Sequence, residues 1–188
     1  MPSVAYFEPT PNPNAFKFHT GTPLTSNGKS LSFSDADVAN RLPLAGSLFE
    51  LGTVEAVLIA EDFVSVSGVR TANWPEIKAQ VEKGLVAYDV AAASELAEIL
   101  EQENHDAKST ATDDPLYQQV NELFETYVRP ALAGDGGGID LVEVKDQQVR
   151  VRYMGACGSC PTSTASTLSA IENLIQDKID PALSVVPV

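Results

Sequence analysis

Residues 139–175 read IDLVEVKDQQVRVRYMGACGSCPTSTASTLSAIENLI, and their pattern predicts the fold of the C-terminal part of the chain. Apolar and polar residues alternate in IDLVEV and QVRVRYM, which predicts two strands around a turn at residues 145–147. The only two cysteines of the chain, Cys157 and Cys160, follow the second strand at once. Pro161 suits the first turn of a helix. The apolar side of that helix carries Leu168, Ile171, Leu174 and Ile175.

The flanking residues complete a small domain that we place at residues 115–188. Asp114 and Pro115 suit the cap and the first turn of a helix, which Pro130 should bend or weaken near its end. The final LSVVPV predicts an edge strand, because Pro187 cannot donate to a strand ladder. The predicted order is therefore α-β-β-α-β. The apolar face of the first helix consists of Val120, Leu123, Phe124, Tyr127, Val128 and Leu132.

A second small α+β domain is predicted at residues 1–93. NAFKFHT alternates like a strand, and VEAVLIAEDFVSVSGV predicts two strands, 54–59 and 63–67, joined by a tight turn. Pro43 near the start of LPLAGSLFEL indicates one helix. Pro75, which follows Asn73 and Trp74, indicates the start of another. Asn27-Gly28 is a signal for a hairpin turn. This part shows no catalytic cluster of residues, so we expect an interaction or docking domain.

Residues 94–114 separate the two domains and are strongly acidic. Residues 94–115 hold seven acidic side chains and one basic one, out of a net charge of −14 for the whole chain. Leu96, Ile99 and Leu100 could close a short helix. The polar remainder cannot bury enough apolar surface to fold alone, so we expect a flexible linker at about 101–113. Because an acidic protein repels phosphate backbones, the composition argues against nucleic-acid binding.

The composition also bears on location. The chain has no apolar run of the roughly 18 residues that a membrane span needs. Its first residues, MPSVAYFEPTPNPNAFKF, lack the features of a signal or transit peptide. We therefore expect a soluble, cytoplasmic protein with no membrane partner. In that compartment a Cys-x-x-Cys pair is more often metal-binding or catalytic than a structural disulfide.

The position of Cys157 and Cys160 favours metal or cluster binding. Both lie at a strand-to-helix turn, where the exposed N–H groups and the helix dipole favour thiolate anions. The residues around them are so small that a large inorganic group could approach the backbone. A [4Fe–4S] cluster or a zinc site typically takes four thiolates, so two chains would have to share one site. His19 and His105 lie in the other domain and the linker and are poor candidates for further ligands.

The two thiols also fit chemistry of a different kind. A dithiol–disulfide redox pair suits the same turn, although the element order is not that of thioredoxin and no basic residue follows Cys160. Zinc held between two chains, inert buried thiols and a thiol-sensing adaptor are further alternatives. The glycine-rich loop at residues 133–139 either shapes the cluster pocket or only supplies turn conformations. Arg150 and Arg152 either contact acidic partners or form a solvated face.

The chain resembles a known family over nearly its whole length. YVRPALAGDGGGIDL, GACGSCPTSTASTL and IENLIQDKI resemble the NifU-like C-terminal domain of the Nfu iron–sulfur carrier family, over about 65 residues. TPNPNAFKF, LPLAGSLFEL, VEAVLIAEDFVSVS and Trp74 resemble the Nfu N-terminal domain. The combination of the Asp-Gly-Gly loop at residues 135–137 with Gly-Ala-Cys-x-x-Cys-Pro is more specific than a bare Cys-x-x-Cys.

The resemblance implies a carrier rather than an enzyme. Cys157 and Cys160 of two chains would bind one [4Fe–4S] cluster, so that the loaded form is a homodimer. The carrier would receive the cluster from an upstream assembly scaffold and pass it to apo iron–sulfur proteins. The N-terminal domain would contact partners.

Overall fold

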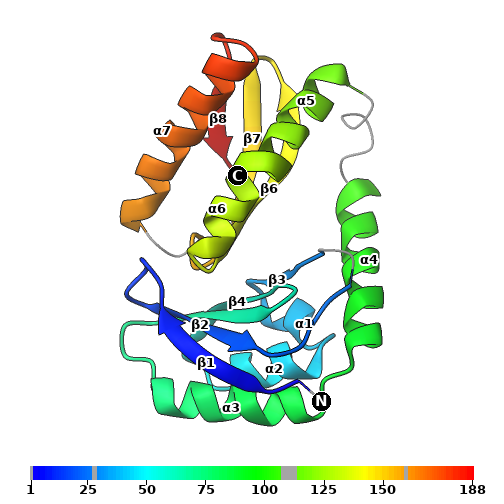
Figure 1. Ribbon diagram of the computed structural model, residues 1–188, viewed down its shortest axis with the longest axis vertical. Coiled ribbons are helices and arrows are strands. Elements are labelled where there is room, and N and C mark those ends of the chain that lie inside the picture. The colour runs from blue at the N-terminus through cyan, green and yellow to red at the C-terminus, as the bar shows by residue number, and fades with distance from the viewer. Residues whose placement is uncertain (1, 27–28, 107–113, 159–160) are drawn as a thin grey trace.

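The computed structural model describes residues 2–26, 29–106, 114–158 and 161–188, and it contains two α+β domains, which confirms the predicted fold class (Figure 1). The N-terminal domain contains a five-stranded antiparallel sheet in the order β1-β2-β5-β4-β3. Its strands are β1 (Val4–Pro9), β2 (Ala15–Thr20), β3 (Leu31–Phe33), β4 (Val54–Ile59) and β5 (Phe63–Gly68).

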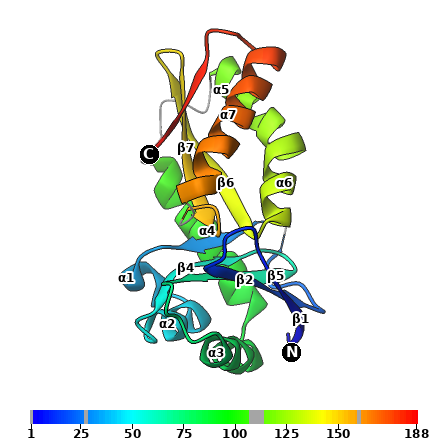
Figure 2. The same ribbon diagram turned by 90° about the vertical axis from the view of Figure 1, so that its left-hand side faces the viewer.

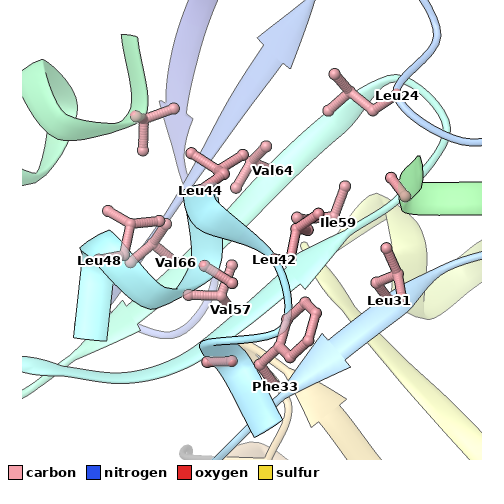
Figure 3. Close-up of a cluster of buried hydrophobic side chains, with 14 of the residues drawn as sticks. Leu24, Leu31, Phe33, Leu42, Leu44, Leu48, Val57, Ile59, Val64 and Val66 are labelled. Atoms are coloured by element: carbon pink, nitrogen blue, oxygen red, sulfur yellow. The ribbon is translucent and has the colours of Figure 1, made fainter. Parts of the chain in front are cut away.

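Helices cover one face of this sheet and enclose the first hydrophobic core. They are α1 (Ala36–Ala39), α2 (Pro43–Phe49) and α3 (Trp74–Val86), and both α2 and α3 have a proline in the first turn, as predicted. Figure 3 shows the centre of the core, where Leu44 and Leu48 of α2 face Val57, Val64 and Val66 of the sheet. Burying such side chains is the main stabilising term of a domain of this size.

A fourth helix, α4 (Val90–Asp106), extends further into the acidic segment than the short helix we expected. Its start is fixed, because Asp89 accepts hydrogen bonds from two backbone N–H groups of the first turn and Ala93 and Leu96 are buried in the N-terminal core. Further along, Arg41 forms an ion pair with Glu103 at 2.8 Å. The rest of the predicted linker, residues 107–113, lies outside the described residues.

The C-terminal domain has the predicted order. It consists of α5 (Pro115–Leu123), a π-helical turn η1 (Phe124–Val128), α6 (Arg129–Gly134), β6 (Gly137–Lys145), β7 (Gln148–Gly155), α7 (Pro161–Lys178) and β8 (Ser184–Pro187). β7 lies between β6, which is antiparallel to it, and β8, which is parallel to it. The helices pack on one face of this sheet, and the second core lies between them.

The first helix of this domain begins where the sequence predicts, and a π-helical turn interrupts it before Pro130. Asp114 accepts a hydrogen bond from the backbone N–H of Leu116, so it caps the helix as expected. The π-helical turn η1 ends at Val128, two residues before Pro130. A proline has no N–H and crowds the preceding turn, and a wider turn relieves that crowding.

The C-terminal domain stands end-on against the sheet face that no helix of the N-terminal domain covers (Figures 1 and 2). The end that meets the sheet contains the last turn of α6, the start of β6 and the end of β7. The thiol site lies at this end, and so the N-terminal domain forms part of its surroundings. In the part of the chain that the structure describes, no helix is long and apolar enough to cross a membrane.

Candidate functional site

Cys157 lies in the turn between β7 and α7, as the sequence predicts. Its side chain is 8% exposed and packs with the second core. The next residue, Gly158, is exposed, and its N–H donates to the carbonyl of Gly155 to close the turn. The thiol is therefore held just below the surface at the start of an 18-residue helix. Cys160 lies outside the described residues.

Gly137 provides the space for the Cys157 sulfur. It is the first residue of β6 and pairs with Gly155, so the backbone of β6 passes directly beside the turn. A Cβ atom at position 137 would lie 2.2 Å from Cys157 Sγ and 2.9 Å from Cys157 N. No side chain other than hydrogen fits there, because non-bonded heavy atoms prefer about 3.5–4.0 Å.

Gly136 and Gly155 have a different role, which is conformational. Their φ angles are +74° and +60°, a region that glycine adopts more readily than other residues. The Gly136 carbonyl accepts a hydrogen bond from the N–H of Ala156, which ties the two turns together. The conformational interpretation of the glycine-rich loop thus holds for Gly136, whereas the shaping of a cluster pocket by this loop stays a prediction. The prediction of one continuous loop at residues 133–139 is wrong, because α6 continues to Gly134 and Gly137 already pairs in the sheet.

Tyr153 brings a phenol close to the thiol. Burial, and second the negative charge of a Cys157 thiolate, raise the pKa of Tyr153 to about 12. The phenol therefore stays protonated at neutral pH. Its oxygen is buried and has no hydrogen-bond partner among the described residues. The sequence predicts only a packing role for Tyr153, and it does pack against the second core.

Two residues of the N-terminal domain reach this end of the C-terminal domain. The side-chain amide of Asn12 donates to the carbonyl of Ala156 at 2.9 Å. The ammonium group of Lys17 donates to the carbonyls of Ala133 and Gly134 at 3.0 and 3.4 Å. The sequence alone points to neither residue. An alternating strand pattern shows that Lys17 faces away from the helix-covered core, but not what covers it instead.

The remaining polar residues that the sequence singled out lie in local pairs or on the surface. His19 makes a 2.9 Å hydrogen bond with Glu8 in the N-terminal domain, and the side chain of His105 lies outside the described residues. Arg150 pairs with Glu143 at 2.6 Å, while Arg152 is exposed. Among the described residues, no group of three or more His, Cys, Asp or Glu side chains is placed to hold a metal ion.

The comparisons with known proteins agree with this division of the chain. Residues 5–92 match the family model described as scaffold protein Nfu/NifU N-terminal, and residues 120–186 match the NifU-like domain model. The NFU1 iron–sulfur cluster scaffold homologs, mitochondrial, of Drosophila persimilis and Drosophila grimshawi are each 30% identical over 167 residues. That alignment covers 89% of this chain and 58% and 55% of the two relatives, so the chain spans little more than half their length.

A solved structure is similar to part of the chain. The NMR structure of a NifU-like protein from Saccharomyces cerevisiae is 26% identical and has a TM-score of 0.40. The match covers 46% of this chain and 82% of the yeast chain.

Proposed function

The chain belongs to the Nfu family, and from this premise we propose that it carries iron–sulfur clusters. Cys157 and Cys160 of two chains bind one [4Fe–4S] cluster, and the loaded homodimer passes it to apo iron–sulfur proteins. The cluster is cargo, and no bond of a substrate is made or broken catalytically, so the protein is not an enzyme. An upstream scaffold that delivers the cluster is part of the same proposal.

One observation carries this proposal. Cys157 lies in a strand-to-helix turn, and the backbone beside its sulfur is kept free of side chains by Gly137. A thiolate in such a position can ligate iron, and backbone N–H groups around a cluster tune it by hydrogen bonds to its sulfides. The chain has two cysteines and a [4Fe–4S] cluster takes four. Two chains therefore complete the ligand set, and a two-fold dimer is the commonest way to pair identical chains.

Transfer proceeds by ligand exchange. A thiolate of the apo-protein attacks one iron, forms a new iron–sulfur bond, and displaces one cysteine thiolate of the carrier. Four such exchanges move the cluster without a change in its oxidation state. The residues before and after Cys157 in the sequence, Ala156 and Gly158, are small, and this leaves room for the incoming thiolate.

Anaerobic reconstitution with iron and sulfide tests the proposal. We expect about four irons and four sulfides per two chains, with absorbance near 400 nm in a fraction that elutes as a dimer. Cys157→Ser should lose stable cluster binding while its circular dichroism spectrum stays unchanged, and Arg152→Ala serves as a surface control. Normal iron content in Cys157→Ser would refute the ligand assignment. A colourless monomer with a readily reduced disulfide between the two cysteines would support a dithiol redox protein instead.

The cytoplasmic location expected from the sequence stays a prediction. So does the role of the N-terminal domain in contacting the target apo-proteins.

A further inference from the structure

The open face of the N-terminal sheet is buried although it carries no helix of its own domain. Lys17 pairs with Ser65 across β2 and β5, and Ser65 pairs with Leu58 across β5 and β4, so the three side chains share this face. Lys17 is 7% exposed, Leu58 2% and Ser65 0%. The C-terminal domain is what covers them, since β7 contacts β3, β4 and β5.

The contacts are made at the residues that flank the thiol. Asn12 holds the carbonyl of Ala156, the residue immediately before Cys157. A Cβ atom at Gly155 would lie 3.0 Å from the Cβ of Leu58, and one at Gly136 would lie 3.1 Å from Ser65 Oγ. The two glycines let the backbone of the thiol site approach the sheet closely.

Lys17 gives this contact its polarity. Its ammonium group lies at the C-terminal end of α6, where the last carbonyls carry the negative end of the helix dipole. The Ala133 carbonyl also accepts a hydrogen bond from the N–H of Gly136. The same ammonium lies 4.3 Å from the centre of the Phe63 ring. It also lies 4.0 Å from the Glu8 carboxylate of its own domain. A buried charge is costly unless it is paired, and the carbonyls of α6 lie closer to the ammonium than Glu8 does, so the position of Lys17 indicates a specific contact.

The same face contains a feature that weakens the contact. The hydroxyl oxygens of Ser65 and Ser67 are buried and have no hydrogen-bond partner among the described residues. A buried polar group without a partner is unfavourable, and water can bond to both hydroxyls once the domains separate. The interface thus combines specific contacts with two hydroxyls that make docking less favourable than paired groups would.

We propose that this sheet face is a docking surface for the thiol end of the same chain's C-terminal domain, and that docking competes with cluster binding. The proposal rests on the function proposed above. A cluster shared by two chains requires the thiol ends of two C-terminal domains to meet. In the docked form a five-stranded sheet lies against the residues that flank Cys157 in each chain. The docked form is therefore the cluster-free form, and it has to open before two chains share a cluster.

Lys17→Met tests the proposal, with Lys78→Met as the matched control. Methionine keeps the apolar stem of Lys17 but cannot donate to α6. Lys78 lies on α3, on the helix-covered face, and pairs with Glu82 at 2.6 Å. Losing hydrogen bonds from a charged donor should weaken docking about tenfold or more. The initial rate of cluster formation in the full-length, cluster-free chain should rise by a similar factor in Lys17→Met and stay unchanged in Lys78→Met.

Two structural readouts complete the test. The Asn12→Ala/Lys17→Met double variant, free of cluster, should show a larger radius of gyration in X-ray scattering than the wild type and shifted NMR signals for Gly136 and Gly155. In the loaded wild-type dimer, the NMR signal of Ser65 should also shift, because the C-terminal domain no longer covers it. Unchanged scattering and spectra in the double variant would refute docking, and equal loading rates would refute competition. A chain that never takes up iron would refute the proposed function and the competition, while scattering of the cluster-free chain would still decide the docking.

Discussion

Gly137→Ala isolates the contact between a glycine and the proposed ligand. The new methyl carbon would lie 2.2 Å from Cys157 Sγ, whereas such atoms prefer about 3.5–4.0 Å. The two atoms must therefore separate by about 1.5 Å. Overpacking of this kind costs about 1–3 kcal/mol of unfolding free energy. Metal–ligand distances tolerate only about 0.2 Å, so cluster occupancy should be lost while the domain still folds.

Chemical denaturation and iron and sulfide analysis after reconstitution measure the two effects. Gly134→Ala is the matched control, because a Cβ atom there meets nothing within 4 Å. An alanine at this helix position should leave stability unchanged or raise it by up to about 1 kcal/mol, with normal cluster content. Full cluster occupancy and wild-type stability in Gly137→Ala would refute the argument that Gly137 makes room for the sulfur.

Two further predictions concern the residues around the site. Tyr153→Phe should not destabilise the chain at neutral pH, because it removes a buried hydroxyl that has no partner among the described residues. Because its pKa is raised, the Tyr153 phenol keeps its proton to a higher pH in the folded state than in the unfolded state. The unfolding free energy of the wild type should therefore fall as the pH rises from 10 to about 12. Denaturation at several pH values should show a smaller fall in Tyr153→Phe. Asp114→Ala should lower the unfolding free energy by about 1 kcal/mol, since it removes the cap of α5. A urea midpoint equal to that of the wild type would show that this cap contributes nothing.

The C-terminal domain was predictable because its signals are local. Asp114 and Pro115 mark the start of a helix, and strand alternation locates β6 and β7. The predicted turn between these strands contains Asp146 and Gln147 at φ of +52° and +62°, which is the geometry of a tight hairpin. Each of these features depends on residues a few positions apart, and so a single sequence contains the information.

The arrangement of the N-terminal sheet was not predictable in the same way. Asn27-Gly28 predicted a hairpin, but the strands on either side do not pair. β2 lies between β1 and β5, and β3 lies at the edge of the sheet next to β4. The turn itself lies outside the described residues. A hairpin signal describes backbone conformation, whereas strand order depends on contacts between distant residues. The environment of Lys17 was not predictable for the same reason. The alternation of a strand does not indicate what covers the other face of its sheet.

In the run Gly136-Gly137-Gly138, the three glycines meet different physical requirements, although the sequence presents them as one motif. Gly136 has a left-handed backbone and faces the N-terminal sheet, so a side chain there would disturb the turn and the docking contact together. Gly137 is not left-handed, and its nearest neighbours are atoms of Cys157. The nearest neighbour of a Cβ atom at Gly138 would be the end of the Met154 side chain at 3.2 Å, and that side chain can move. A change at Gly137 therefore acts first on the thiol, and Lys17→Met tests the contact without touching the thiol. If cluster binding and docking are separate properties of this end of the molecule, the two variants should affect cluster loading in opposite directions.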